Sequence, residues 1–219
     1  MRQGFLRRGR IVNRKRIARV MNYQGWYGIP RRRIRQGVAV RVLSRFENVL
    51  KRQFVANAPN RVWMGDMTEF QTGEGKLYLA DLLDAFSAQL VGYAFGPAPT
   101  AELASAALER ARRWRRPARG LLHHTDRGPA YVSWNYQHRL ETLGAKPSWS
   151  KPGTPADNTR VESFHALFKR EFVRGRIFPT RAQAISEATQ WLRFYQRHRY
   201  HSSLGNLSPA EFERHNGPN

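Results

Sequence analysis

The stretch "RVWMGDMTEFQTGEGKLYLADLLDAFSAQLVGYAF", residues 61–95, decides the fold of this chain. Its runs 62–70, 77–86 and 89–96 are rich in aromatic, β-branched and other apolar residues, which is typical of strands. The glycines of "QTGEGK" between the first two runs mark a turn. We therefore predict three consecutive strands joined as a hairpin meander.

Helix and strand patterns alternate after this meander. Thr100 is suited to cap a helix that ends before Pro117, and the apolar run "GLLHHTD" is typical of a short buried strand. The alternation predicts an α/β fold with a mixed five-stranded sheet and helices on both of its faces. The expected elements are a helix at 101–114, a strand at 120–126, a helix at 133–144 and a strand at 145–150.

Cap residues mark three further helices towards the C-terminus. Asn158 or Asp157 can cap a helix that carries Glu162 at the edge of a buried apolar stripe. In two capping boxes, a Ser or Thr and a Glu or Gln three residues later are expected to exchange hydrogen bonds. The boxes are Thr180 with Gln183, at the start of a helix through Arg197, and Ser208 with Glu211. The apolar stripe of the helix that carries Glu162 consists of Val161, Phe164, Phe168 and Phe172.

The chain is strongly basic, and its charge is unevenly distributed. The formal net charge is +22. Residues 1–61 hold 15 Arg and 2 Lys against one acid, Glu47, whereas residues 62–219 hold 21 basic and 15 acidic residues. A basic arm joined to a nearly balanced globular part is typical of a protein that binds a polyanion. Nucleic acid is favoured over an acidic membrane surface, because the sequence has no amphipathic anchor or long apolar span.

The basic arm contains one predicted helix. Asn13 can cap a helix through "RKRIARVMNYQ", with Ile17 on its apolar face and Gly25 as its stop. This is either the recognition helix of a truncated helix-turn-helix module or a basic surface helix that reads no sequence. The opposite face carries the predicted DNA contacts Arg14, Lys15 and Arg19. The expected domains are a small helical basic segment at 1–27, a basic linker at 28–60 and a core at 61–214.

The chain contains no cysteine. This excludes disulfides, a catalytic thiolate and any zinc site built with cysteine. The Arg-rich start lacks the apolar stretch and small-residue cleavage site of a secretion signal. We therefore expect a cytoplasmic, nucleoid-associated protein of a prokaryote, or a nuclear protein if the source is eukaryotic.

Three acidic residues are the candidate functional groups. Asp66 lies inside a strand-forming run, where Asp is unfavourable, and Asp126 follows an apolar strand, at the end where ligand sites of α/β sheets gather. Glu162 follows Asp126 after a gap of 35 residues. Each alone could be a turn former, a cap or a solvated surface acid. Together they suit Mg²⁺, which prefers carboxylate oxygens, and without metal their like charges would raise at least one pKa.

The sequence segments around these carboxylates resemble those of a known family. The segments "GLLHHTDRGPAY", "PADNTRVESFHALFKREF" and "FYQRHRYHSSLGNLSPAEF", together with residues 61–95, closely resemble the OrfB-type insertion-sequence transposases. These belong to the DDE superfamily and carry a retroviral-integrase catalytic core. The resemblance is strong over 61–213 and weak over 10–25, and it implies a ribonuclease H-like fold for the sheet and its helices.

The resemblance also implies an activity and the residues that carry it. Asp66, Asp126 and Glu162 match the catalytic, metal-binding carboxylates of the family, including the 35-residue gap. This implies cleavage and strand transfer of DNA with two Mg²⁺ ions, or Mn²⁺ in their place, and with water and then a DNA 3′-hydroxyl as nucleophiles. The implied partners are element-end and target DNA, further copies of the chain on DNA, and a protein from an upstream reading frame. Further predicted DNA contacts are Lys169, Arg197 and Arg199, although a solvated helix end explains the two arginines nearly as well.

The sequence departs from the family pattern at several points. Ala156 stands where the family usually has Trp. The N-terminal module is incomplete, so recognition of the element ends is expected to need another chain, a fused upstream reading frame or residues lost from a decayed copy. Asp81 is an extra acid in a strand that is usually uncharged there; it is either a fourth acid near the site or a solvent-facing residue, and we expect the latter. His123 and His124 adjoin Asp126, but we expect partly buried strand residues rather than site contacts.

Three functions remain open on the sequence alone. The first is a DNA transposase that cleaves and joins insertion-sequence ends. The second is a catalytically incomplete DNA-binding remnant or regulator of transposition, and the third is a hydrolysis-only nuclease of the same fold. The presence of all three carboxylates in matching contexts favours the first over the second. It does not separate the first from the third, because the same metals can activate water.

Overall fold

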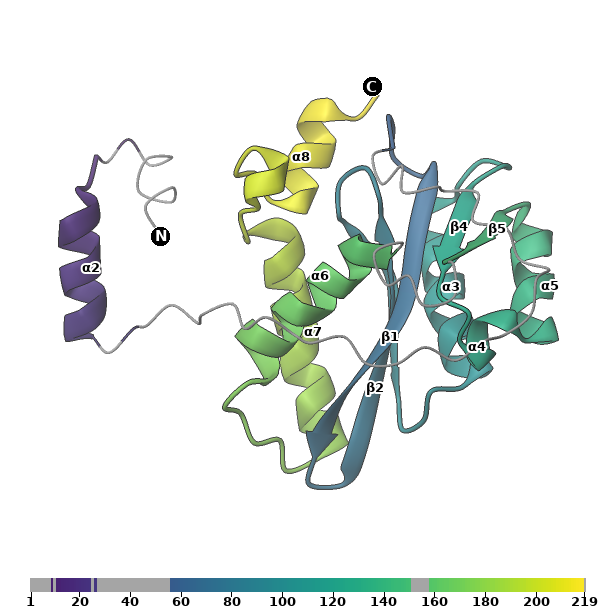
Figure 1. Cartoon of the computed structure of the whole chain (residues 1–219), viewed down its shortest axis with the longest axis horizontal. Helices are drawn as coiled ribbons and strands as arrows, with labels where there is room; N and C mark the ends of the chain where they lie inside the picture. The colour runs from purple at the N-terminus through teal and green to yellow at the C-terminus, as the bar shows by residue number, and fades with distance from the viewer. Residues whose placement is uncertain (1–8, 10, 25, 27–55, 151–157, 219) are drawn as a thin grey trace. The chain divides into compact units, whose positions relative to one another are not determined.

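The computed structural model consists of two compact units, Met1–Gln36 and Gly37–Asn219, which are described separately (Figure 1). The structure describes residues 9, 11–24, 26, 56–150 and 158–218. Most of the predicted linker at 28–60 therefore lies outside the described residues, and the predicted domain limits stay predictions. Within the described residues, no helix combines the length and the apolar character needed to cross a membrane.

The described part of the N-terminal unit contains helix α2, Arg14–Tyr23. The side chain of Asn13 accepts a hydrogen bond from the backbone N–H of Lys15 at 2.8 Å, so the predicted N-cap is confirmed. Ile17 is buried, whereas Val20 is 49% exposed. The helix ends one residue before Gln24, and the predicted stop at Gly25 lies outside the described residues.

The second unit is built on a mixed five-stranded sheet in the order β3-β2-β1-β4-β5. The first three strands form the predicted antiparallel meander, and β4 and β5 continue the sheet as parallel strands beside β1. The predicted fold class is thereby confirmed. The strands are β1 Val62–Thr72, β2 Gly75–Asp84, β3 Leu90–Gly96, β4 Leu122–Thr125 and β5 Lys146–Trp149.

The β1–β2 hairpin is closed by a two-residue turn after Thr72. The Thr72 hydroxyl donates a hydrogen bond to the carbonyl oxygen of Gly75 at 2.7 Å, and Gly75 has a φ of +96°, which favours glycine. Gly73 lies directly against the backbone of Pro179, so that a Cβ at this position would overlap the Pro179 carbonyl. Glycine is therefore favoured at Gly75 by its positive φ and at Gly73 by the close approach of the Pro179 backbone.

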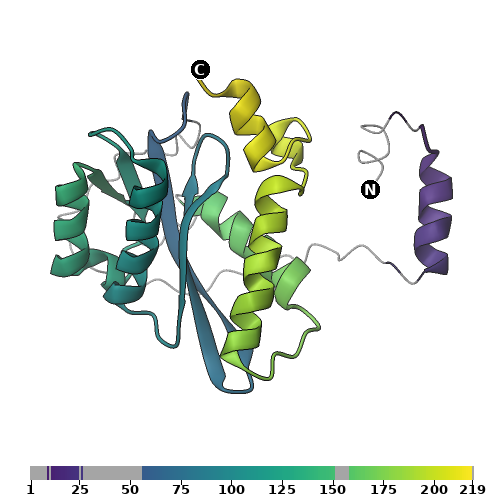
Figure 2. The same cartoon turned by 180° about the vertical axis from the view of Figure 1, so that it is seen from behind.

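Helices cover both faces of the sheet, as Figures 1 and 2 show. Alternate residues of β1 point to opposite faces, so Met64 joins the core under α6 and α7 while Trp63 joins the core under α3 and α5. Both side chains are fully buried. These helices are α3 Ala101–Arg115, α5 Trp134–Leu143, α6 Thr159–Phe168 and α7 Arg181–Arg197, with α4 Pro129–Val132 and α8 Pro209–Asn216 as shorter helices.

The cap predictions are confirmed in position and partly in detail. Ser208 and Glu211 form a complete capping box. Thr180 accepts a hydrogen bond from the Gln183 backbone, but the Gln183 side chain donates to Glu187 instead of completing the box. Asn158 occupies the N-cap position of α6, yet its amide donates to the carbonyl oxygen of Gly65 at 3.4 Å.

The helix that carries Glu162 changes its hydrogen-bonding pattern after Phe168. It continues as a π-helical segment, Lys169–Val173, which the apolar periodicity did not predict. A short 3-10 helix, Ser202–Leu204, likewise precedes α8. The predicted apolar stripe of Val161, Phe164, Phe168 and Phe172 is confirmed, because all four side chains are buried in the core under α6 and α7.

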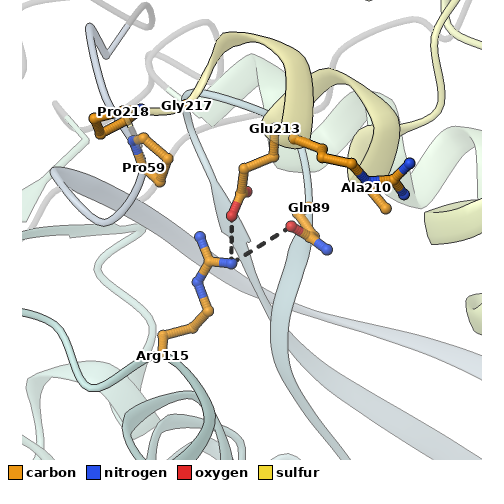
Figure 3. Close-up of a pocket in the computed structure, with 8 residues that line it drawn as sticks. Pro59, Gln89, Arg115, Ala210, Glu213, Gly217 and Pro218 are labelled. Carbon is orange, nitrogen blue, oxygen red and sulfur yellow. Dashed lines mark hydrogen bonds and ion pairs between the residues drawn. The ribbon is translucent and has the colours of Figure 1, made fainter.

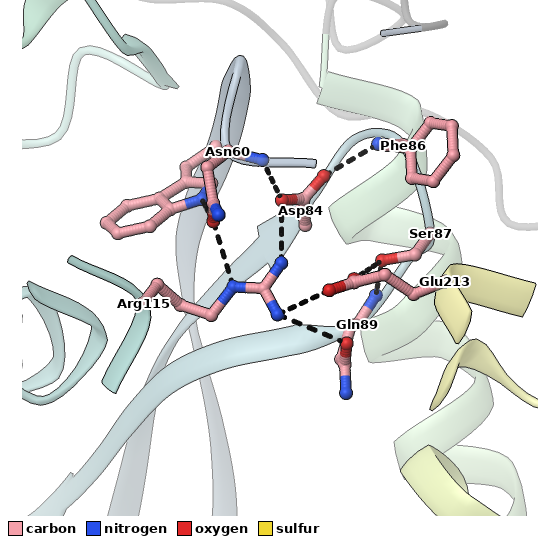
Figure 4. Close-up of polar contacts among 8 residues, drawn as sticks. Asn60, Asp84, Phe86, Ser87, Gln89, Arg115 and Glu213 are labelled. Carbon is pink, nitrogen blue, oxygen red and sulfur yellow. Dashed lines mark hydrogen bonds and ion pairs between the residues drawn. The ribbon is translucent and has the colours of Figure 1, made fainter. Parts of the chain in front are cut away.

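Arg115, at the end of α3, ties three parts of the core together (Figure 4). Its guanidinium lies 2.5 Å from Glu213 of α8 and 3.6 Å from Asp84, which ends β2. The Asp84 carboxylate also accepts hydrogen bonds from the backbone N–H groups of Asn60 and Phe86. Burial raises the pKa of Asp84, while these donors and Arg115 oppose that rise. The C-terminal helix is thus fastened to the sheet through one buried cation.

The same guanidinium lies at the base of a surface pocket (Figure 3). Glu213 and Gln89 contact the same guanidinium nitrogen, and Pro59 and Gly217 also line the pocket. The side chain of Arg115 is only 10% exposed. Since the guanidinium is already bound by Glu213, Gln89 and Asp84 of the same chain, the pocket is explained by the packing of α8.

Arg115→Ala is expected to destabilise the protein strongly. The substitution leaves the buried carboxylate of Asp84 and the partly buried carboxylate of Glu213 without their cation, which costs about 3 kcal/mol or more of the free energy of unfolding. Arg113→Ala is the matched control. Arg113 lies on the same helix and forms an ion pair with Glu109, and its side chain is 75% exposed. Loss of that pair is expected to cost less than about 0.5 kcal/mol. Urea denaturation followed by tryptophan fluorescence measures both, and equal losses would contradict the expectation.

Candidate active site

Asp66 lies in the middle of β1, on the face that packs under α6 and α7. It alternates with Met64 and Phe70 of the buried core on that face, and its side chain is 21% exposed. The register of the β1–β2 pair places Asp66 directly opposite Asp81. Because residues directly opposite each other in an antiparallel pair point to the same face, both carboxyl groups lie on the α6 side of the sheet.

Asp81 is fully buried, so the expectation that it faces solvent is wrong. Strand β2 is central in the meander and covered on both faces, and Asp81 stands between Leu79 and Leu83 in the apolar row under α6. One carboxylate oxygen, Oδ1, lies 2.5 Å from Nε2 of His165. Asp81 is therefore a fourth acid close to Asp66, which was the alternative reading of its sequence position.

His165 of α6 stands between these two carboxyl groups. Its other ring nitrogen, Nδ1, lies 3.6 Å from Oδ2 of Asp66, and its side chain is 10% exposed. Burial disfavours the charged imidazole, but the carboxylates of Asp81 and Asp66 outweigh this and raise the pKa of His165. The sequence reasoning missed His165, although a polar residue beside the Phe164 and Phe168 stripe was a visible signal.

Asp126 approaches Asp66 from the neighbouring parallel strand. Gly65 of β1 pairs with Thr125, the last residue of β4, so Asp66 and Asp126 follow at the same level of adjacent strands. The Asp126 carboxylate accepts a hydrogen bond from the backbone N–H of Gly128 at 2.8 Å. Burial raises the pKa of Asp66 to about 7; His165 opposes this rise and the negative charge of Asp126 adds to it. The expected repulsion between these carboxylates is therefore present.

Glu162 lies in the first turn of α6 and is exposed. Partial burial raises the pKa of Glu162, and His165, three residues further along the helix, opposes this. The bond from Asn158 to the carbonyl oxygen of Gly65 fastens the start of α6 beside Asp66. Among the described residues, however, no three acidic or histidine side chains gather in the arrangement of a closed metal site. The structure thus brings Asp66 and Asp126 together and places Glu162 on the adjacent helix.

His123 and His124 are strand residues, as expected, and they are fully rather than partly buried. Nε2 of His123 lies 2.8 Å from the Tyr136 hydroxyl, and burial lowers the pKa of His123 to about 3. The ring of His124 contacts the hydroxyl groups of Ser148 and Ser150. These two histidines join β4 to α5 and to the end of β5.

The predicted DNA contacts occupy different environments. Arg14, Lys15 and Arg19 are exposed on α2, and Lys169 and Arg197 are exposed on the second unit. Arg199 instead forms a two-bond pair with Glu171, at 2.7 and 2.9 Å. A phosphate at Arg199 would therefore have to compete with a carboxylate of the same chain. All six DNA contacts stay predictions.

Comparisons with known proteins identify the family of the chain. Two family models, both described as "Integrase core domain", match residues 56–155 and 143–209. The transposase for insertion sequence element IS904 of Lactococcus lactis is 38% identical over 214 residues, which cover 95% of this chain and 83% of that protein. A 31 kDa protein of insertion element IS600 from Shigella sonnei is 43% identical, over 75% of this chain but only 61% of that protein.

A solved structure shows the same fold. The catalytic core domain of HTLV-2 integrase, in complex with magnesium in a trimeric form, superposes with a TM-score of 0.54 at 16% identity. The match covers 71% of this chain and 97% of that domain. The ribonuclease H-like arrangement implied by the sequence is therefore confirmed. With the identity to the IS904 protein over most of both chains, it follows that this chain belongs to the insertion-sequence transposases that carry an integrase core domain.

Proposed function

We propose that this chain cleaves the ends of an insertion sequence and transfers them to target DNA, with Asp66, Asp126 and Glu162 as its catalytic carboxylates. The observation that carries the proposal is that Asp66 and Asp126 directly follow Gly65 and Thr125, which are paired in the parallel strands β1 and β4. Burial and the neighbouring charge together hold the pKa of Asp66 near 7. Two neighbouring acids, of which Asp66 has a raised pKa, are in a chain of this family what metal-dependent phosphoryl transfer needs.

The residues at this site fit a divalent cation. All three side chains offer carboxylate oxygens, the ligands that Mg²⁺ prefers, and the repulsion felt by Asp66 is the kind that a cation relieves. Asp66, Asp126 and Glu162 would hold two Mg²⁺ or Mn²⁺ ions. When bound, such ions stabilise the charge that develops on the attacking and leaving oxygens of an in-line displacement. The magnesium complex of the HTLV-2 integrase core agrees with this choice of metal.

Residues of the chain itself bind and orient the DNA in this proposal. Lys169 is exposed and follows Glu162 by seven residues, so it suits a phosphate next to the carboxylates. The cations of the arm, among them Arg14, Lys15 and Arg19, add contacts that depend on charge rather than on sequence. Water, and then a DNA 3′-hydroxyl, would be the successive nucleophiles. In both steps the chain holds the scissile phosphate in line with the nucleophile.

The proposed partners are element-end DNA, target DNA and further copies of the chain assembled on DNA. The trimeric form of the HTLV-2 integrase core supports an oligomer. A partner protein from an upstream reading frame is part of the same proposal. A cytoplasmic, nucleoid-associated location in a prokaryote stays a prediction that follows from DNA as the substrate.

Asp66→Asn is expected to abolish catalysis without abolishing DNA binding. Loss of one metal-binding carboxylate removes several kcal/mol of charge stabilisation, so cleavage and joining should fall at least about 100-fold. Labelled element-end DNA, target DNA and Mg²⁺ are incubated with each variant, and products are resolved on a denaturing gel. Glu187→Gln is the control, because Glu187 lies on the surface of α7, where it contacts Arg176 and Gln183 and none of the candidate catalytic residues.

The products separate the competing functions. Joined molecules that disappear in Asp66→Asn support the transposase. Nicking by the unmodified chain without any joining would indicate a nuclease that only hydrolyses. Intact DNA binding with no metal-dependent product would contradict both enzymatic functions and leave a DNA-binding remnant or regulator.

Lys169→Ala is expected to weaken DNA binding equally for all sequences. Removing one phosphate contact should reduce the slope of log affinity against log salt concentration by about 1. Lys146→Ala is the matched control: Lys146 is also exposed but begins β5, at the opposite end of the parallel strands from Asp126. Fluorescence anisotropy at several salt concentrations measures both slopes. Equal changes in the two variants would remove Lys169 from the proposed DNA path.

A further inference from the structure

Three titratable side chains form a line from the core of the protein to the candidate active site. The line begins at Asp81, which is fully buried in β2, and passes through the imidazole of His165 in α6. It ends at Asp66, which is partly exposed. Each member comes from a different element, so the line exists only in the folded chain.

The two contacts of His165 differ in kind. Nε2 and Oδ1 of Asp81 are 2.5 Å apart, a short charge-assisted hydrogen bond that fixes the plane and tautomer of the ring. Nδ1 and Oδ2 of Asp66 are 3.6 Å apart, which is beyond a hydrogen bond but close enough for electrostatic attraction. His165 is thus anchored to Asp81 and faces Asp66 without occupying its oxygen lone pairs.

Packing does not require this arrangement. The neighbours of Asp81 on the same face of β2 are Leu79 and Leu83, and those of His165 on α6 include Phe164 and Phe168. An apolar pair of similar volume would suit this surrounding, because a buried ion pair seldom stabilises more than the apolar groups that could replace it. The buried acid and histidine therefore point to a role at the end of the line, at Asp66.

We propose that His165, anchored by Asp81, is a positioning residue that orients the Asp66 carboxylate for metal binding. This inference rests on the proposed function. Oδ1 of Asp66 accepts a hydrogen bond from the backbone N–H of Met67 at 2.7 Å, and Oδ2 faces His165, so the carboxyl group is held from two directions. Groups that orient a metal ligand from behind in this way commonly change metal affinity 10–100-fold when they are removed.

The test measures Mn²⁺ binding to the full chain without DNA, by electron paramagnetic resonance of the free ion. The double variant Asp81→Val with His165→Leu replaces both partners by apolar groups, so its melting temperature should stay close to that of the unmodified chain. Its dissociation constant for Mn²⁺ should rise about tenfold or more. If the double variant does not fold, His165→Gln carries the same expectation, because its amide can still donate a hydrogen bond to Asp81 while the ring nitrogen that faces Asp66 is removed.

Two further variants separate positioning from general stability. Asp81→Asn keeps an oxygen that accepts the His165 hydrogen bond, so Mn²⁺ affinity should return towards that of the unmodified chain. Asp84→Asn alters another buried carboxylate of the same strand, one that contacts Arg115 rather than His165. Its melting temperature should fall while its Mn²⁺ affinity stays unchanged.

The outcomes distinguish this inference from the proposed function. If a folded double variant, or His165→Gln alone, binds Mn²⁺ as tightly as the unmodified chain while Asp66→Asn does not bind it, the positioning role is overturned and the metal site stands. If the unmodified chain does not bind Mn²⁺, or if Asp66→Asn binds it equally well, the metal site and the positioning role fail together. Equal loss of Mn²⁺ affinity in Asp84→Asn would also overturn the positioning role.

Discussion

The register of β1 with its two neighbours is the constraint on which the rest of the structure depends. Pairing with β2 sets Asp66 opposite Asp81, and pairing with β4 brings Asp126 to the same level from the other side. A slip of one residue would turn Asp66 to the opposite face, under α3 and α5, and would bring Trp63 to the α6 side. The large side chains of the two cores, Trp63 and Met64 among them, therefore fix the position of the acids as well as the fold.

Strand β2 shows two ways of burying a carboxylate, and they serve different parts of the molecule. Asp84 is satisfied by two backbone N–H groups and by Arg115, and through Arg115 it fastens α8 to the sheet. Asp81 contacts His165 through Oδ1 alone, and the second ring nitrogen of His165 faces Asp66. The first arrangement ends within the core. The second passes a charge interaction on to a partly exposed acid, so its energetic cost can serve a site as well as a fold.

Much of the fold could be predicted from local patterns, because each pattern is satisfied within one element. The strand composition of residues 61–95, the cap at Asn13 and the box at Ser208 needed no knowledge of tertiary contacts. The burial of Asp81 could not be predicted in this way, because it follows from which strands are adjacent. The link from Asn158 to Gly65 spans 93 residues, and the contact of His165 with Asp81 spans 84. Such long-range pairs require the sheet register, which a single sequence does not provide.

Asp66 and Glu162 differ in how firmly the structure holds their carboxylates and in how exposed they are. Asp66 is held by the sheet, by the Met67 backbone and by His165, whereas Glu162 is exposed at the start of a helix. A carboxylate held in a partly buried place loses little freedom when a cation arrives, but its charge is costly until then, as its raised pKa of about 7 shows. A solvated carboxylate has the opposite balance. In the proposed site, the acid of β1, the acid that follows β4 and the exposed acid of α6 would therefore combine preorganisation with access for a metal ion and a DNA phosphate.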